Sequence, residues 1–205
     1  MFTLSVPLIL ASTSPRRQQF LRELGLSFAI QPAAVDETPR PGEPADDFIR
    51  RMAMDKAAAV SADHPEACVL GADTVVLLDD TIFGKPENPE QALAMLRRLQ
   101  GRTHRVGSAF ALLCPAQGIR ESRTVHTAVT FGSFPDTVLQ AYVDSGEPLD
   151  KAGAYGIQGQ GGFLVRSIDG SYSNVVGLPI NEVVQSLLHH ALITPAPPAV
   201  HPWRE

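Results

Sequence analysis

The sequence predicts an α/β protein with a mixed, twisted sheet and helices packed on its faces. Strand-like apolar segments alternate with helical segments in the N-terminal part of the chain, which is the pattern of α/β folds. Two long strand-like segments follow each other around a single glycine in the middle, which adds an antiparallel pair. With 205 residues, 44% of them hydrophobic, the chain can build one substantial core, as one domain or as two lobes that share a cleft.

The N-terminal part of the chain alternates between strands and helices. The expected elements, in order, are a strand at residues 8–11, a helix at 14–25, a strand at 27–31, a loop at 32–44, a helix at 45–60 and a central strand at 67–78. Ser14 and Pro15 define the first helix as its N-cap and first helical residue, and Gly25 ends it. The central strand is indicated by its Val and Leu content.

The C-terminal part begins with a helix and a strand pair and ends with a helix and a tail. Its expected elements are a helix at residues 88–101, strands at 104–114 and 119–131, a helix at 135–144, a glycine-rich loop at 146–162, a strand at 163–168 and a helix at 180–191. Gly118 marks the turn between the two long strands. We predict one domain over residues 1–193 and a mobile, proline-rich tail over 194–205.

The opening segment, residues 1–11, is apolar and ends in small residues, so a targeting signal has to be considered. It has no Lys or Arg ahead of the apolar run, and Pro7 interrupts that run, which favours a buried first strand. No later stretch has the uncharged length needed to span a bilayer. We therefore expect a soluble, cytoplasmic protein with no membrane partner.

Charge and cysteine content narrow the function classes. The net charge of −5 gives no broad basic surface, so we expect no nucleic-acid partner, and any bound phosphate must be held by a local cluster. Cys68 and Cys114 are the only cysteines, too few for a disulfide framework and without metal-ligand spacing. Both are interpreted as small buried apolar residues in a reducing compartment.

Common catalytic signatures are absent from the sequence. It contains no G-x-x-x-x-G-K-[ST], no G-x-G-x-x-G between a strand and a helix, and no H-E-x-x-H. His104 and His126 stand in strand-like segments without the other ligands of a zinc site, so we interpret both as structural. No Ser, His and Asp set has local motif support for acyl transfer. Phosphate binding, if present, must use another device.

Arg16 and Arg17 fall in the first turn of the first expected helix. Exposed N–H groups and the helix dipole disfavour cations there by roughly 0.3 to 1 kcal/mol each, and a bound anion would reverse the sign. Ser12, Ser14 and the free amides of this turn could hydrogen-bond phosphate oxygens while an arginine clamps them. The alternative is a pair of solvated arginines on a surface helix.

Lys56 and Lys85 are two further candidate cations. Lys56 lies on the apolar stripe that Ile49 and Met52 define, so its ammonium points along the buried side of the helix. Lys85 stands in the turn GKP. The alternatives are a lysine whose stem lies on the core edge while its head reaches water, and an ordinary surface turn lysine.

Asp73 is an acid inside the apolar run CVLGADTVVLL. A buried carboxylate must be hydrogen-bonded, paired with a cation or bound to a metal. Gly71 leaves room beside it for a ligand or another backbone, whereas the structural alternative is an aspartate that ends a strand and caps a turn. Asp36 and Glu37, in the acidic loop, could add carboxylate oxygens around Mg²⁺, although loop acids are commonly only solvated.

The segment DKAGAYGIQGQGG, residues 150–162, combines five glycines with Lys151, Tyr155 and Gln158. Glycines let the backbone approach a ligand closely. An aromatic face and an amide are groups that stack on and hydrogen-bond to a nucleobase. A long flexible surface loop would have the same glycine content.

Taken together, six motifs resemble the Maf family in order and spacing. They are LASTSPRR at residues 10–17, VDE at 35–37, GADTVV at 71–76, GKP at 84–86, DKAGAYGIQG at 150–159 and GSYSNVVGLP at 170–179. The resemblance covers roughly residues 8–192. The joint occurrence of these motifs is far more specific than any one of them.

The resemblance implies a metal-dependent nucleoside triphosphate pyrophosphatase with an elongated α/β fold whose two lobes flank a nucleotide cleft. By motif position, Asp73 corresponds to the catalytic base, while Arg16, Thr74 and Gln158 match positions that set substrate choice. The residues expected to contact the phosphates are Ser12, Arg16, Arg17, Lys56 and Lys85. The residues expected to bind a magnesium or manganese ion are Glu37 and Asp73.

GADT together with YGIQG is similar to the family branch that acts on dTTP and UTP, rather than the branch that acts on 7-methyl-GTP. The implied mechanism is in-line attack of water on the α-phosphorus, with Asp73 taking the proton and pyrophosphate leaving. A house-cleaning or division-linked role and a homodimer are also implied. The alternatives are a non-catalytic, nucleotide-binding inhibitor of septum formation and a pyrophosphatase for a modified or purine nucleotide.

Overall fold

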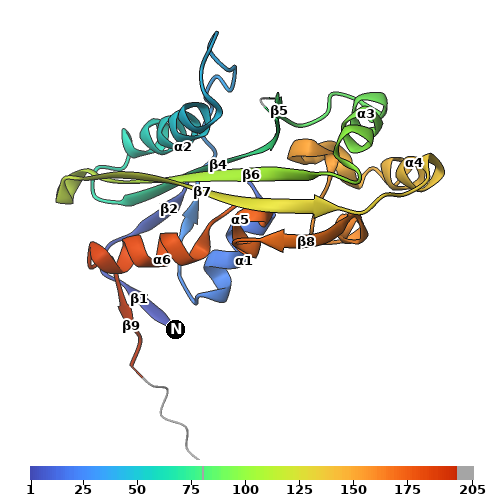
Figure 1. The fold of residues 1–205 in the computed structure, drawn as a ribbon. Coiled ribbons are helices and arrows are strands. Elements are labelled where there is room, and N and C mark those ends of the chain that lie inside the picture. Colours follow the sequence, from blue (N-terminus) through green and yellow to red (C-terminus); the bar gives the residue numbers. More distant parts are fainter. Residues whose placement is uncertain (80, 198–205) are drawn as a thin grey trace, which may run out of the picture.

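The computed structural model describes residues 1–79 and 81–197 and shows an extended sheet with helices on both faces (Figure 1). The strands of this sheet are β2 (Leu8–Leu10), β3 (Ala29–Ile30), β4 (Cys68–Leu78), β5 (Thr81–Phe83), β6 (Thr103–Cys114), β7 (Ile119–Phe131) and β8 (Val165–Asp169). The helices are α1 (Pro15–Glu23), α2 (Ala45–Ser61), α3 (Pro89–Leu99), α4 (Asp136–Asp144), α5 (Tyr172–Val176) and α6 (Ile180–His189).

The sheet is mixed, as the sequence predicts. Its order is β3-β2-β4-β6-β7-β8, with β5 paired to β4. Strand β2 runs parallel to β3 and β4, which are reached through helices, whereas β4, β6, β7 and β8 pair antiparallel. The turn between β6 and β7 ends at Gly118, whose φ of 64° lies in the left-handed region that glycine adopts without strain.

Three apolar clusters form the core. On one face, α1 and α6 bury Leu21 and Leu187 against β2, β4 and β6. On the other face, α2 buries Ile49 and Met52 against the same strands. A third cluster, at the far end of the sheet, joins α3 and α4 to β6 and β7 around Phe131. The central strand β4 therefore contributes to all three clusters.

The helices are short. The longest, α2, has 17 residues, and it carries acidic and basic side chains along its exposed side. Over residues 1–79 and 81–197, no helix has both the length and the apolar composition that crossing a bilayer requires.

The two chain ends pair with each other, which the sequence does not predict. Strand β1 (Phe2–Leu4) pairs antiparallel with β9 (Ile193–Pro195) in a separate two-stranded sheet. The prediction of a mobile tail at 194–205 is therefore wrong for its first two residues, because Thr194 and Pro195 belong to β9. Residues 198–205 of that tail lie outside the described residues.

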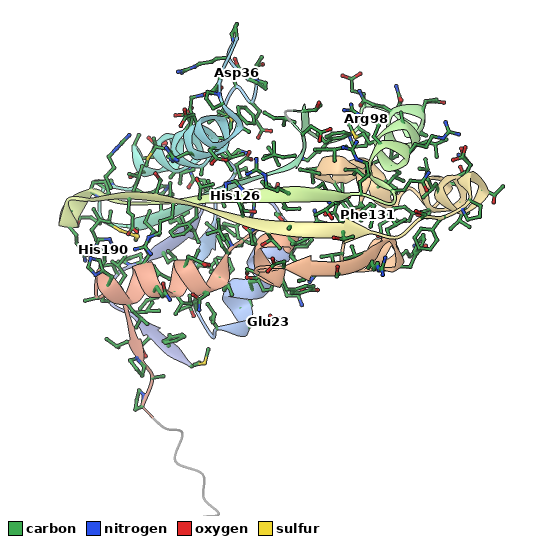
Figure 2. The ribbon with its side chains drawn as sticks, viewed as in Figure 1. Glu23, Asp36, Arg98, His126, Phe131 and His190 are labelled. Atoms are coloured by element: carbon green, nitrogen blue, oxygen red, sulfur yellow. A yellow bond between two sulfur atoms is a disulfide. The ribbon has the colours of Figure 1, made fainter. Side chains whose placement is uncertain are left out.

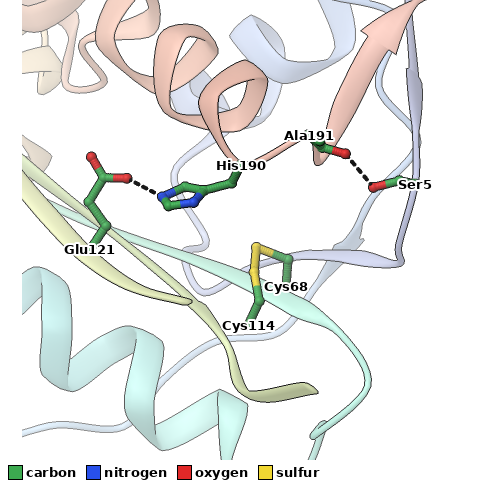
Figure 3. The surroundings of a disulfide bond; sticks show 6 residues. All are labelled: Ser5, Cys68, Cys114, Glu121, His190 and Ala191. Atoms are coloured by element: carbon green, nitrogen blue, oxygen red, sulfur yellow. Dashed lines mark hydrogen bonds and ion pairs between the residues drawn. A yellow bond between two sulfur atoms is a disulfide. The ribbon is translucent and has the colours of Figure 1, made fainter. Parts of the chain in front are cut away.

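Cys68 and Cys114 are joined by a disulfide (Figure 3), so their interpretation as two separate thiols is wrong. Cys68 begins β4 and Cys114 ends β6, and the register Val69↔Leu113 places them opposite each other. Their Cα atoms lie 4.3 Å apart, close to the spacing of a facing non-hydrogen-bonded pair. The expected burial is confirmed, with 1% and 2% exposure. The number of cysteines in the sequence does not show that strand pairing places the two side by side.

The glycine-rich segment is more regular than the loop expected at residues 146–162. It contains three short 3₁₀ turns, at Glu147–Asp150, Ala152–Ala154 and Gln160–Leu164. The following strand, expected at 163–168, consequently begins only at Val165. The expected strand at 27–31 is likewise reduced to the two residues of β3.

Candidate active site

A cavity of about 960 Å³ opens between the N-terminal end of α1, helix α2, strand β4 and the glycine-rich segment. The nine side chains that the family resemblance assigns to catalysis, substrate choice, phosphate or metal all line it: Ser12, Arg16, Arg17, Glu37, Lys56, Asp73, Thr74, Lys85 and Gln158. These positions are scattered between residues 12 and 158 of the sequence. The fold therefore brings the predicted chemistry to one place.

The cavity concentrates positive charge in a chain whose net charge is −5. Its lining has five Lys and Arg side chains against four Asp and Glu. The cations are Arg16, Arg17, Lys56, Lys85 and Lys151, and the acids are Glu37, Asp73, Glu147 and Asp150. A local cluster of this kind is what the sequence requires of a phosphate-binding site in an acidic protein.

Asp73 lies in the middle of β4 and is paired with Lys56 of α2. The Lys56 ammonium donates to Asp73 Oδ1 at 2.7 Å and lies 2.7 Å from Glu37 Oε1. Lys56 is 9% exposed, which confirms that its side chain follows the buried side of its helix. Gly71 permits the pairing, because a Cβ there would collide with the backbone of Ala53. The space beside Gly71 thus holds a helix backbone, one of the two occupants that the sequence allowed.

The surroundings of Glu37 favour its charged form. Desolvation raises the pKa of this carboxyl group, but hydrogen bonding and charge attraction from Lys56, with smaller contributions from Lys85 and Arg17, bring its pKa below the usual value. Asp36, the neighbouring acid, does not join the cavity lining. Figure 2 shows it on the loop that projects beyond α2, where it caps the amide of Thr38.

Arg17 is held by the protein itself. Its guanidinium donates to the carbonyl oxygens of Ala72 and Gly177 at 2.9 and 2.8 Å, and to the hydroxyls of Ser12 and Thr74 at 3.1 and 3.2 Å. Four of its five N–H groups are thereby engaged. Burial lowers the pKa of Arg17, although Asp73 opposes the shift. The solvated arginine that the sequence allowed is excluded at this position.

A buried polar network behind Arg17 was missed by sequence reasoning. Thr74 Oγ1 lies 2.8 Å from Ser108 Oγ, which donates to the carbonyl oxygen of Asn174. The Asn174 amide in turn donates to Val106 and Thr127. The signal in the sequence was Ser108, inside the apolar strand VGSAFALLC. A buried serine hydroxyl needs a hydrogen-bond partner.

Arg16 and Lys85 lie at the rim of the cavity. Arg16 Nη1 lies 3.7 Å from Asp150 Oδ2, which connects α1 with the start of the glycine-rich segment. Lys85 is exposed and follows Gly84, whose carbonyl oxygen accepts from the amide of Gly153. The glycine-rich segment therefore contacts the Arg16 side chain and the backbone just before Lys85.

Tyr155 and Gln158 differ in their surroundings. The Tyr155 ring is 5% exposed, packs edge-on against Phe131 and hydrogen-bonds through its hydroxyl to His104 at 2.8 Å. Its aromatic face is thus largely covered by the core, contrary to the expected stacking surface. Gln158 is half-buried, and no residue within 1–79 and 81–197 hydrogen-bonds its amide. His104 is structural, as expected.

The carboxylates fit a divalent cation that is shared with a substrate. Within the described parts of the chain, no three His, Cys, Asp or Glu side chains are grouped closely enough to hold a metal ion. Glu37 and Asp73 nevertheless each place an oxygen 2.7 Å from one ammonium nitrogen. Two convergent carboxylates are the number that Mg²⁺ commonly takes from protein when phosphates and water complete its shell.

The α/β fold with its mixed sheet carries a cation-rich cavity, a half-buried acid and two convergent carboxylates, a combination suited to binding a phosphorylated small molecule. Comparison with known sequences makes this specific. The model of the Maf-like protein family matches residues 7–190, and the chain belongs to that family.

Curated relatives match almost the whole chain. A protein of Desulfotalea psychrophila is 51% identical over 95% of this chain and 100% of its own length. One of Nitratidesulfovibrio vulgaris is 51% identical over 94% and 91%, and one of Myxococcus xanthus is 49% identical over 92% and 94%. All three carry the name dTTP/UTP pyrophosphatase.

Proposed function

We propose that this chain is a nucleoside triphosphate pyrophosphatase that hydrolyses dTTP and UTP to the monophosphate and pyrophosphate. The observation that carries the proposal is the single cavity in which Asp73, Glu37 and Lys56 meet a cluster of cations. Relatives that bear this enzyme name, and that align over at least nine tenths of the chain, support the same conclusion.

Asp73 is assigned as the general base for a water that attacks the α-phosphorus. Lys56 holds its Oδ1 oxygen, and no donor among residues 1–79 and 81–197 is bonded to its Oδ2 oxygen. That oxygen is free to accept a proton from water while the other is fixed in place. Positioning of this kind, with charge stabilisation, is the main assistance that proteins give to phosphoryl chemistry.

Glu37 and Asp73 are the residues that would hold a magnesium or manganese ion. When bound, such an ion neutralises phosphate charge and lowers the pKa of water. The Lys56 ammonium has three N–H donors, so it would keep its bond to Asp73 Oδ1 and offer another donor to a phosphate. Removal of divalent ions by EDTA should abolish turnover, and restoring magnesium should recover it.

The phosphates are assigned to the cations and hydroxyl around the end of α1. Arg16 and Lys85 lie at the rim, Arg16 beside Asp150, and Lys56 and Ser12 lie deeper. Arg17 can offer one remaining N–H and its charge, because its other donors are engaged within the protein.

Gln158 is assigned to read the base, because its amide can accept from N3–H and donate to O4 of uracil or thymine. Cytosine presents the opposite pattern, so CTP leaves unmatched groups at about 1 to 3 kcal/mol each. Thr74 contributes to substrate choice by shape, since its hydroxyl is already bonded to Arg17 and Ser108. Gln158→Ala should reduce the UTP to CTP ratio of kcat/KM; an unchanged ratio contradicts base reading.

Two other functions are tested by one assay. A non-catalytic, nucleotide-binding inhibitor of septum formation would bind dTTP but release no pyrophosphate. A pyrophosphatase for a purine or modified nucleotide would release pyrophosphate faster from such a nucleotide than from dTTP or UTP. Pyrophosphate release by the purified protein from a panel of dTTP, UTP, CTP, GTP and 7-methyl-GTP, with magnesium, separates all three.

We also propose a cytoplasmic location, expected from the opening segment of the sequence, and a homodimer, which the family resemblance implies. The dimer is tested by light scattering of the purified protein at micromolar concentration. The location is tested by fractionation of cells that express the full chain.

A further inference from the structure

The turn that carries Gln158 is held from behind by one carboxylate. Glu147 Oε2 accepts from the amide of Gln160 at 2.9 Å, and its Oε1 accepts from the amide of Gly161 at 3.0 Å. Tyr142 of α4 donates its hydroxyl to the same Oε1 at 3.0 Å. Both oxygens of Glu147 are therefore occupied by donors that surround the turn.

Tyr142 extends this attachment to the other side of Gln158. Its hydroxyl oxygen accepts from the amide of Gly156 at 3.2 Å, while the hydroxyl proton goes to Glu147. Tyr142 is 4% exposed and sits on a regular helix, so its position is fixed by the core. The backbone is thus tied two residues before Gln158 and again two and three residues after it.

The glycines of the turn show how closely this attachment fits. Gly159 has a φ of 80° and a ψ of −149°, a conformation essentially restricted to glycine. A Cβ at Gly159 would lie 2.9 Å from Glu147 Oε2, and one at Gly161 would collide with the Tyr142 hydroxyl. The turn is therefore packed directly against the Glu147 and Tyr142 side chains, with no room for a Cβ at Gly159 or Gly161.

We propose that Glu147 is a positioning residue that, with Tyr142, fixes the turn of Gln158 and thereby sets the selectivity for uracil and thymine over cytosine. This inference rests on the proposed function, since it requires that Gln158 reads the base. The ionised form of Glu147 accepts hydrogen bonds from three donors. A neutral side chain in its place cannot accept all three. An amide in its place would offer one acceptor and turn a donor toward a backbone N–H.

The test compares Glu147→Gln with wild type in two measurements. The first is the ratio of kcat/KM for UTP to that for CTP, which should fall about 10-fold, chiefly through a higher KM for UTP. The second is amide hydrogen exchange of the ligand-free protein, in which the peptides over 156–162 should lose protection. Tyr142→Phe, which removes one of the three donors, should shift both readouts in the same direction by less.

Glu121→Gln is the matched control. Glu121 is also a carboxylate with two side-chain partners, Arg123 and His190, but it lies on β7 outside the cavity lining. The Glu121→Gln variant should have a lower melting temperature than wild type, and its ratio of kcat/KM for UTP to that for CTP should be unchanged. Equal loss of activity on both nucleotides in Glu147→Gln would reveal a merely structural role and overturn the inference.

The outcomes distinguish this inference from the proposed function. If Gln158→Ala abolishes the UTP preference and Glu147→Gln or Tyr142→Phe retains it, the positioning role is wrong and base reading stands. If wild type has no UTP preference, or Gln158→Ala keeps it, base reading is wrong and the positioning role falls with it. Rapid exchange of the Gln160 and Gly161 amides in wild type would overturn the inference even if both variants fail to fold.

Discussion

Asp73 is the side chain on which the proposed chemistry depends most directly, and its surroundings allow a clean substitution. Asp73→Asn keeps the size of the side chain and its hydrogen bond to Lys56, but removes the base and one negative charge. We expect a folded protein whose turnover of dTTP is lower by about 10² to 10⁴. Asp136→Asn, at an exposed acid paired with Arg97, is the control and should retain full activity. Near-normal turnover by folded Asp73→Asn would refute the assignment.

His104 is expected to make stability depend on pH. Burial lowers its pKa from 6.5 to about 4, and its ring packs against Phe131 and Tyr155. Between these pH values the unfolded chain binds a proton that the folded chain does not. This contribution to stability is therefore lost as pH falls from 6.5 toward 4, by about 3 kcal/mol in total.

Denaturant titrations between pH 4 and 7 measure this dependence. His104→Gln should lower stability at every pH but flatten the slope of the unfolding free energy against pH. His189→Gln, at an exposed histidine, should leave the slope unchanged. An identical slope in wild type and His104→Gln would show that another group is responsible.

Individual site residues were predictable where type and local pattern suffice. An acid in an apolar run, Asp73, and a lysine on an apolar stripe, Lys56, had to find partners, and they find each other. Arg17 was harder, because its carbonyl partners at Ala72 and Gly177 lie 55 and 160 residues away. Contacts between positions so distant in the chain depend on the assembled fold.

For the strands and turns, the sequence predicted which elements exist better than it predicted the residues at which they begin and end. The long strands β4, β6 and β7 have strong apolar patterns and were found nearly complete. β1 and β9 were missed because each is three residues long and pairs with a strand from the other end of the chain. The Cys68 and Cys114 pair was missed for a related reason, since its formation depends on strand register.

The disulfide between β4 and β6 gives a prediction about stability. It closes a chain segment with a sequence separation of 46, for which constraint of the unfolded chain contributes about 4 kcal/mol. Wild type should therefore lose stability on addition of reductant and expose two titratable thiols only then. The double variant Cys68→Ala with Cys114→Ala is the control and should be less stable and indifferent to reductant. A wild-type melting temperature that reductant does not change would contradict this role.

The arrangement of the whole chain followed from the alternation of elements and from the six motifs together. Alternating strands and helices predicted the α/β class with a mixed sheet, in which β2 pairs parallel with β3 and β4, and the turn at Gly118 predicted the antiparallel pair of β6 and β7. The convergence of nine side chains on one cavity was implied only by the family resemblance. Composition and periodicity indicate which residues stand in an unusual local environment. They do not indicate which of these residues contact one another in the folded chain.

The central proposal is that the cavity directs water to the α-phosphorus of a pyrimidine nucleoside triphosphate. The purified protein is incubated with dTTP and magnesium in water enriched in oxygen-18, and the products are analysed by mass spectrometry. We predict dTMP and pyrophosphate as the products, with the label in dTMP alone. Label in pyrophosphate would place the attack on the β-phosphorus, and formation of dTDP with orthophosphate would place cleavage between the β- and γ-phosphates; either result would contradict the proposal.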